Sequence, residues 1–203
     1  MSIGNVIWLN GTSSAGKSTL AWKLQEYMEK DYYWLSNDAF TDMPHNKQYD
    51  RDWSGTYRTA ITMLYRTVRL FVEDGKNVII DHVMTNDDKG VCEELIDCVK
   101  FMHGIHVMFL FVSCPLDELN RREKARGDRN IGNAESQFVK LLPTDMYDFV
   151  VNTYDDTTEK CAELIIEKHN NILNDPSYVT AFERMYINKA PYLQSEKYQW
   201  IRV

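Results

Sequence analysis

The residues whose types and spacing most clearly predict chemistry form one run near the N-terminus. The run is Gly11, Thr12, Ser13, Ser14, Ala15, Gly16, Lys17 and Ser18. It matches the pattern G-x-x-x-x-G-K-[ST], in which glycines let the backbone wrap around an anion and successive N–H groups point at nucleotide phosphates. Lys17 is expected to reach the β- and γ-phosphates, and the Ser18 hydroxyl to join the coordination of Mg²⁺. We therefore predict a nucleotide site over residues 11–19, with Thr19 included.

The sequence around this run supports the prediction. The apolar residues 6–9 are typical of a buried strand, and residues 19–28 carry apolar side chains at helical spacing. A strand, a glycine-rich loop and a helix form the context in which the pattern binds phosphate. Residues 46–50 resemble a guanine-binding Asn-Lys-x-Asp motif, but their aspartate comes one residue late and no apolar strand precedes them. Adenine, and hence ATP, is the better prediction.

Two aspartates stand where ligands are expected to bind. Asp38 and Asp81 each end a predicted strand, and open α/β folds bind ligands at the carboxyl ends of their strands. A carboxylate there can orient an acceptor hydroxyl and accept its proton as phosphoryl transfer proceeds. Alternatively, it can hold Mg²⁺ through water. The other interpretation is a helix cap or a turn, since aspartate is common at both.

A run of charged residues at positions 121–129 is the second concentrated signal. Such runs usually form a solvated helix face. Here Arg126 and Arg129 flank Gly127, which permits a hinge, and they follow an apolar strand and a helix. Planar guanidinium groups match the charge that spreads over phosphoryl oxygens during transfer. We predict that these arginines belong to a lid that closes on the nucleotide.

Apolar runs alternate along the chain in the manner of strands and helices. We predict strands at residues 6–9, 32–35, 78–80, 107–112 and 149–151, and helices at 19–28, 57–72, 92–101, 115–127 and 158–173. Residues 40–55 show no clear period and are predicted to be a loop region. This alternation indicates an α/β fold with a parallel sheet of about five strands flanked by helices. We expect one domain over residues 1–203, with a core at about 3–173 and an aromatic-rich C-terminal extension, 174–203, packed on it.

Composition narrows the classes of partner. The 203 residues carry a net charge of −7 and a pI of about 5.3, which makes binding to long nucleic acids unlikely. The sequence contains no apolar run of the roughly 18 residues that a membrane span needs and no recognisable signal peptide, so we expect a cytoplasmic protein. Neither the four cysteines nor the five histidines show metal-ligand spacing. Only His82, beside Asp81, is a candidate for ligand contact. The sequence leaves the oligomeric state open.

Several segments also match a known family in order. They are residues 9–18, Asp38 with Met43-Pro44, residues 79–81, Cys114, Arg122-Glu123, residues 125–129, Gly132, Gln137 and Tyr147-Asp148. In these segments the chain resembles the chloramphenicol phosphotransferase family, which comprises small P-loop kinases that phosphorylate a primary hydroxyl of an antibiotic. The likeness covers about residues 3–170, and its Gly-Asp-Arg segment is more specific than the phosphate loop alone.

This resemblance implies a shikimate-kinase-like fold, ATP with Mg²⁺, a general base at Asp38 and lid arginines at 126 and 129. The catalytic residues are then expected to be Asp38, Lys17, Arg126, Arg129 and Asp81, with Mg²⁺ held by Ser18 and, through water, by Asp81. The sequence departs from the family pattern at His82, Leu142 and Asn152. Residues 40–75, which should line the acceptor pocket, show little likeness, and the segment after 173 shows none.

The leading hypothesis is therefore a kinase that transfers the γ-phosphate of ATP to a hydroxyl of a small molecule, either an antibiotic such as chloramphenicol or a related metabolite. A second hypothesis is a kinase for a nucleoside or a nucleic-acid end. A third, from a different class, is a nucleotide-binding regulator or ATPase switch with no acceptor. The sequence does not identify the acceptor.

Overall fold

The computed structural model describes residues 3–86, 92–127 and 131–188 of the chain. Within these residues one parallel sheet holds five strands, which are β1 (Val6–Asn10), β2 (Tyr32–Ser36), β3 (Asn77–Asp81), β4 (Val107–Ser113) and β5 (Phe149–Asn152). Their order is β2-β3-β1-β4-β5, with every neighbouring pair parallel. The predicted α/β class and all five predicted strands are confirmed.

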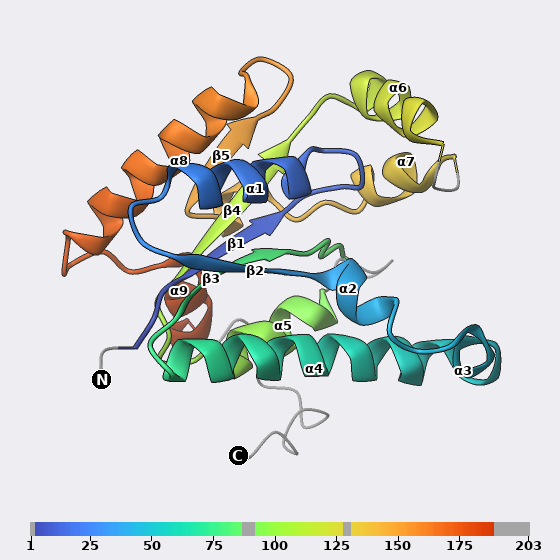
Figure 1. Ribbon diagram of the computed structural model, residues 1–203, viewed down its shortest axis with the longest axis horizontal. Coiled ribbons are helices and arrows are strands. Elements are labelled where there is room, and N and C mark those ends of the chain that lie inside the picture. The colour runs from blue at the N-terminus through green and yellow to red at the C-terminus, as the bar shows by residue number, and fades with distance from the viewer. Residues whose placement is uncertain (1–2, 87–91, 128–130, 189–203) are drawn as a thin grey trace.

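Helices cover both faces of the sheet (Figure 1). One face carries α1 (Lys17–Tyr27) and α8 (Thr158–Leu173), and the other carries α4 (Trp53–Glu73), α5 (Glu93–Phe101) and α9 (Ala181–Ile187). Both faces of the central strands are therefore buried, which explains why β1 and β4 consist of almost uninterrupted apolar residues. Among the described residues, no helix combines the length and apolar character needed to cross a membrane.

The remaining helices lie beyond the carboxyl ends of the strands, on the right of Figure 1. They are α2 (Asn37–Thr41), α3 (Asn46–Arg51), α6 (Leu116–Arg126) and α7 (Asn133–Phe138), whereas a 3₁₀ turn, η1 (Thr144–Met146), lies directly before β5. Because β1 lies between β3 and β4, the loops after these three strands meet at one edge. These helices surround that edge.

The prediction of a loop over residues 40–55 is wrong, because α2, α3 and the start of α4 occupy most of this region. Helices of five or six residues complete too few turns to show a periodic apolar pattern. Side-chain caps define them instead. Ser36 accepts a hydrogen bond at the start of α2, His45 and Gln48 form a capping box on α3, and Asp52 caps α4.

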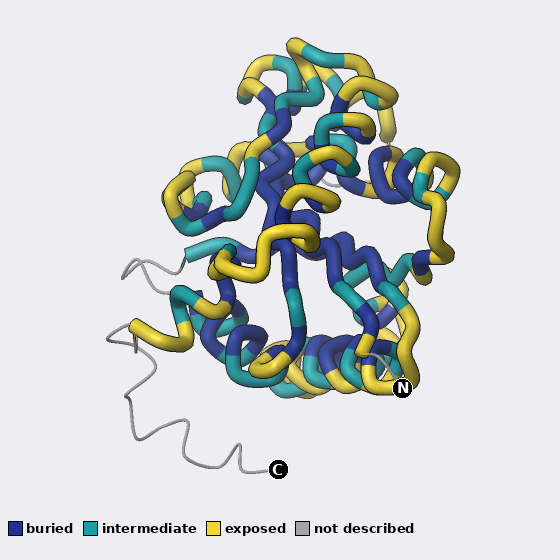
Figure 2. Tube along the Cα trace, turned by 90° about the vertical axis from the view of Figure 1, so that its left-hand side faces the viewer, coloured by how far each residue is buried: buried dark blue, intermediate teal, exposed yellow. Residues whose placement is uncertain are grey.

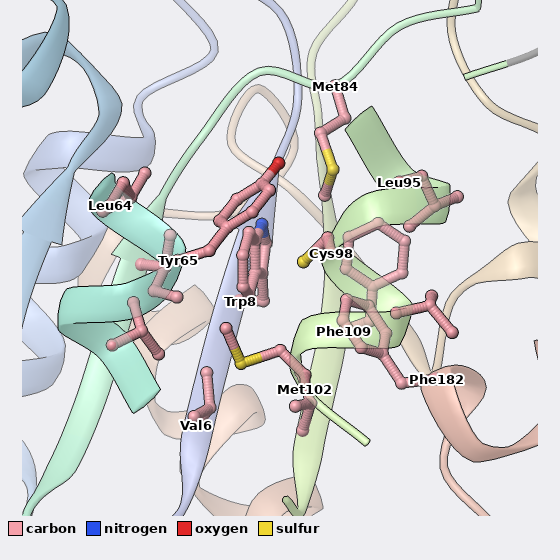
Figure 3. Close-up of a cluster of buried hydrophobic side chains, with 14 of the residues drawn as sticks. Val6, Trp8, Leu64, Tyr65, Met84, Leu95, Cys98, Met102, Phe109 and Phe182 are labelled. Carbon is pink, nitrogen blue, oxygen red and sulfur yellow. The ribbon is translucent and has the colours of Figure 1, made fainter. Parts of the chain in front are cut away.

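The core is divided by the sheet into two apolar clusters, and the buried residues run through the centre of the molecule in Figure 2. Trp8 of β1 is fully buried on the face covered by α4 and α5. Its ring lies 5.7 Å from the Tyr65 ring and 5.7 Å from the Phe182 ring, measured between centroids (Figure 3). Phe182 also contacts Phe109 edge-on at 5.2 Å. Aromatic packing thus joins β1 and β4 to helices α4 and α9.

The first part of the C-terminal extension is attached to the core by α9. Besides the buried Phe182 ring, the buried carboxylate of Asp148 accepts hydrogen bonds from Ala181 N at 2.7 Å, Phe109 N at 2.8 Å and the Tyr178 hydroxyl at 3.1 Å. Burial raises the pKa of this carboxyl, and the two backbone hydrogen bonds oppose that shift. Helix α9 therefore packs on the core through Ala181 and Phe182, and residues 189–203 lie outside the described part of the chain.

We expect Phe182→Ala to lower the free energy of unfolding by about 3–5 kcal/mol, the usual effect of truncating a buried phenylalanine. Chemical denaturation followed by tryptophan fluorescence would measure the change. The control is Ile187→Ala on the same helix, where the side chain is 66% exposed; it should change stability by no more than about 0.5 kcal/mol. Equal small effects of both variants would show that α9 does not stabilise the domain.

Candidate active site

The loop after β1 has the backbone geometry that a phosphate site needs. Ser14 and Gly16 adopt positive φ angles of 64° and 92°, and Gly16 is the N-cap residue directly before α1. Gly11 lies so close to β4 that a Cβ atom there would be 2.5 Å from the carbonyl oxygen of Val112. The first glycine of the motif is therefore required by packing, and the second by backbone conformation. Successive N–H groups in such a loop form a concave anion site at the N-terminus of a helix.

Lys17, Ser18 and Asp81 meet at the carboxyl ends of β1 and β3. The Ser18 hydroxyl donates a hydrogen bond of 2.5 Å to Asp81 Oδ2. The buried Lys17 ammonium donates to the Thr12 carbonyl at 3.0 Å and lies 3.7 Å from Asp81 Oδ1. A cation and two oxygen ligands are thus present where the phosphates of a nucleotide would reach them.

These oxygens are suitable for Mg²⁺. A hydroxyl and a carboxylate are hard oxygen ligands, and Mg²⁺ usually takes only one or two from the protein, with water and substrate phosphates supplying the others. Within residues 3–86, 92–127 and 131–188, no cluster of three or more His, Cys, Asp or Glu side chains could hold a metal. The Ser18–Asp81 pair therefore fits a metal that arrives with a nucleotide, not one that is held by the protein alone.

Asp38 lies in the first turn of α2, directly after β2. Its side chain lines one pocket with phosphate-loop residues, and the other lining residues are Asn37, Asp81, Val83 and Arg126. The structure thus brings the two predicted aspartates, the loop lysine and one predicted arginine to the same pocket. Arg129 lies outside the described residues.

Beside Asp38, a second group of polar side chains lies against α4 and α5. The Asn37 and Glu94 side chains lie near the Tyr57 hydroxyl, and burial, with the nearby Glu94 carboxylate, raises the Tyr57 pKa well above its usual value. Tyr57 is therefore a hydroxyl donor at any physiological pH. His82 is fully buried, with Nε2 3.2 Å from Glu94 Oε2, and is not among the residues that line the pocket around Asp38.

The phosphate loop is also supported by hydrogen bonds from Thr153 and Arg122, which the sequence analysis did not predict. Thr153, after β5, donates a 2.8 Å hydrogen bond from its hydroxyl to the Ala15 carbonyl. Arg122 of α6 donates to that hydroxyl at 3.0 Å and to the Thr153 carbonyl at 2.8 Å. Arg122 stands in one of the segments that carry the family likeness. Arg122 supports the loop through Thr153, which is 31 residues away in the sequence, and motif spacing does not predict a contact of this kind.

A buried carboxylate connects α6 to α7. Glu123 is 1% exposed, and it accepts hydrogen bonds from Gly132 N at 2.7 Å and Ala134 N at 2.8 Å. Two charge-assisted hydrogen bonds to backbone N–H groups compensate for burial of the charge. As a result, the start of α7 has a fixed position beside the helix that carries Arg126.

Comparison with known proteins identifies the family. The model of the chloramphenicol phosphotransferase-like proteins matches residues 4–170. The chain belongs to this family. Its members are phosphotransferases with a P-loop, and the phosphate-loop geometry described above is the part of the structure that this chemistry uses.

The relatives found are named as phosphotransferases or kinases. A Mycobacterium tuberculosis (strain H37Rv) protein, named provisionally as an O-phosphotransferase, is 29% identical over 209 residues, covering 91% of this chain and 89% of that protein. The adenylyl-sulfate kinase of Clostridium acetobutylicum is 27% identical over 185 residues, covering 84% and 86%. The structure of the M. tuberculosis APS kinase CysC with AMPPNP and APS has a TM-score of 0.63 at 18% identity, covering 84% of this chain and 99% of that one. The chain is thus an enzyme of the phosphotransferase class.

We expect Gly11→Ala in this phosphotransferase-like chain to weaken nucleotide binding by about 10-fold or more, because relieving such a backbone clash costs ~1–3 kcal/mol and displaces the loop. Calorimetry with an ATP analogue would measure this. Gly104→Ala is the control, since Gly104 also has a positive φ, 81°, but a Cβ there meets nothing within 4 Å. Equal nucleotide affinity in both variants would contradict the role given to Gly11.

Proposed function

We propose that the protein transfers the γ-phosphate of ATP to a hydroxyl group of a small molecule. The observation that carries this proposal is the convergence of the phosphate loop, Asp38, Asp81 and Arg126 on one pocket. A kinase needs a phosphate cradle and a carboxylate beside the acceptor hydroxyl, and this pocket contains residues suited to both tasks. Membership of a phosphotransferase family supports the same conclusion.

In the proposed reaction, the acceptor hydroxyl lies beside Asp38, whose carboxylate orients it and takes its proton. The hydroxyl oxygen forms a bond to the γ-phosphorus as the bond between that phosphorus and the β–γ bridging oxygen breaks, which leaves ADP. Lys17 and Arg126 stabilise the charge on the transferred group, and we assign the same task to Arg129 from its position in the sequence. Mg²⁺, held beside Ser18 and Asp81, would neutralise charge on the β- and γ-phosphates.

The acceptor is either an antibiotic such as chloramphenicol or a related small metabolite. The family description favours the first. An adenylylated acceptor is the alternative favoured by a specific finding, because one relative is named as an adenylyl-sulfate kinase. In both cases we assign the acceptor to the side of Asp38 where α2 contacts α4, near Asn37 and Tyr57.

Replacing Asp38 with asparagine should lower kcat for phosphoryl transfer by about 100-fold or more, as loss of a general base usually does, while ATP binding persists. The measurement is phosphate gain by mass spectrometry against a panel of chloramphenicol, other antibiotics, nucleosides and adenylyl sulfate, with ATP affinity measured in parallel. Asp42→Asn is the matched control, since Asp42 is an exposed aspartate at the end of the same helix, and it should retain activity.

Two outcomes would contradict this assignment. ATP turnover without any phosphorylated acceptor, unchanged by Asp38→Asn, would favour an ATPase switch. Phosphorylation of an acceptor at an unchanged rate in the Asp38→Asn variant would leave the kinase but remove Asp38 as its base.

A separate test concerns the metal. Asp81→Asn keeps an oxygen that can accept the Ser18 hydrogen bond but removes the charge. We expect the Mg²⁺ concentration for half-maximal nucleotide binding to rise by about 10-fold, in the range found when groups that orient metal ligands are replaced. Calorimetric titration of nucleotide at several Mg²⁺ concentrations measures this without an acceptor. An unchanged Mg²⁺ requirement would show that Asp81 does not contribute to the metal site.

A further inference from the structure

A side chain of α7 contacts the phosphate loop directly. Gln137 Oε1 accepts a 2.6 Å hydrogen bond from the backbone N–H of Ser13, 124 residues away in sequence. A neutral carboxamide oxygen thus accepts from one backbone N–H of a loop of the kind that forms anion sites. This contact fixes the peptide that carries the Ser13 side chain, and no part of the proposed reaction has yet used it.

Helix α7 is held firmly enough to position the loop. Its start is bound by the buried carboxylate of Glu123. At its end, the Lys140 carbonyl accepts a 2.8 Å hydrogen bond from Asn86 N, in the segment after β3. Because α6, α7 and the segment after β3 are joined in this way, the Gln137 carboxamide belongs to a fixed support. The loop therefore donates this hydrogen bond to a segment that is held on both sides of Gln137.

Ser13 has a hydroxyl that the rest of the described structure does not use. The residue is 3% exposed, and its Oγ has no hydrogen-bond partner among the described residues. Yet Ser13 lines the same pocket as Lys17 and Asp38. A buried hydroxyl without a partner is costly, and an incoming phosphate oxygen is the kind of acceptor that would satisfy it.

We propose that Gln137 is a positioning residue that fixes Ser13 so that the Ser13 hydroxyl donates a hydrogen bond to the γ-phosphate. The proposed ligand atom is an oxygen of the γ-phosphate, the group that ATP has and ADP lacks. Ser13 then belongs to the groups that hold the transferred phosphoryl group, and Gln137 acts only through it. This inference rests on the proposed kinase function but concerns nucleotide binding, which is measured without an acceptor.

The test compares AMPPNP, which has a γ-phosphate group, with ADP. We expect Ser13→Ala to weaken AMPPNP binding by about 10-fold, a typical value for one hydrogen bond to a charged group, and to leave the ADP affinity within about 2-fold. Gln137→Met, which keeps side-chain length but removes the acceptor oxygen, should have the same selective effect. Isothermal titration calorimetry in Mg²⁺ would give both affinities for each variant.

A double-mutant cycle tests whether Gln137 acts through Ser13. The Ser13→Ala/Gln137→Met variant should bind AMPPNP about as weakly as either single variant, because contacts that depend on each other do not add. Ser14 provides the contrast, since its Oγ is also buried without a partner among the described residues but no hydrogen bond to Gln137 is seen. Ser14→Ala combined with Gln137→Met should therefore be additive.

Gln25→Met is the matched control for stability. Gln25 lies near the C-terminal end of α1, away from the phosphate loop, and its Nε2 also makes one hydrogen bond to the backbone, to the Tyr32 carbonyl at 2.7 Å. It should leave both nucleotide affinities unchanged, with a melting temperature within about 4 °C of that of Gln137→Met.

Equal losses of ADP and AMPPNP affinity in Ser13→Ala, or no loss of either, would overturn the proposal. Additive effects in the Ser13–Gln137 cycle would refute only the positioning role of Gln137 and would leave the Ser13 contact standing. If the Gln137→Met variant does not fold, the Ser13→Ala variant still tests the γ-phosphate contact. Gln137→Asn then takes the place of Gln137→Met in the double-mutant cycle. Failure of the kinase function would instead appear as selective AMPPNP binding with no acceptor phosphorylated.

Discussion

The structure depends on one constraint: the phosphate loop must keep a concave backbone toward the pocket, so its polar groups that face away from the pocket need hydrogen-bond partners elsewhere in the protein. The Thr12 carbonyl accepts from Lys17, and the Ala15 carbonyl accepts from Thr153, which Arg122 in turn supports. Asn10, fully buried just before the loop, exchanges hydrogen bonds with the backbone of Met84. Buried backbone groups left without partners would be costly, and these contacts therefore determine how β1, α6 and the segments after β3 and β5 fit together.

The same constraint explains the order of the strands in the sheet. β1 delivers the loop from the centre of the sheet, β3 on one side delivers Asp81, and β4 on the other side provides the carbonyl against which Gly11 packs. Asp38 enters from β2, one strand further away, at the start of a short helix capped by Ser36. Asp81 lies at the end of β3, while Lys17 and Asp38 lie in helices that begin soon after β1 and β2, so backbone pairing of these strands sets how far apart the three groups start.

Much of this could be predicted because it is local or periodic. The buried strands show as apolar runs, helix α8 was predicted with the bounds it has, and the phosphate-loop motif places its own residues. The short helices α2, α3 and α7 escaped prediction because one or two turns carry no period, and a capping histidine such as His45 is an uncommon signal. His82 was singled out beside Asp81, yet alternation along an extended segment turns its ring into the core.

The long-range polar contacts were beyond sequence reasoning for a different reason. Gln137 and Thr153 bind backbone atoms of the loop. Every residue type has these backbone atoms, so the sequence of the loop does not indicate which of them accept or donate such a hydrogen bond. A motif therefore predicts which side chains touch the nucleotide but not which distant ones hold the loop in place. In this protein those supports come from α6, α7 and the segment after β5.

The pocket around the phosphate loop and the neighbouring surface of α2 and α4 differ in how they are built. The pocket is formed at the ends of paired strands and is supported by buried hydrogen bonds. The neighbouring surface is exposed: the rings of Trp53 and Tyr57 stack there 5.0 Å apart, and the Trp53 and Met43 side chains are 61% and 71% exposed. Residues on such a surface can change without disturbing the core. Substitutions on this surface would alter which acceptor fits while leaving the phosphate loop intact, so the surface beside α2 and α4 is where the proposed acceptor should be sought.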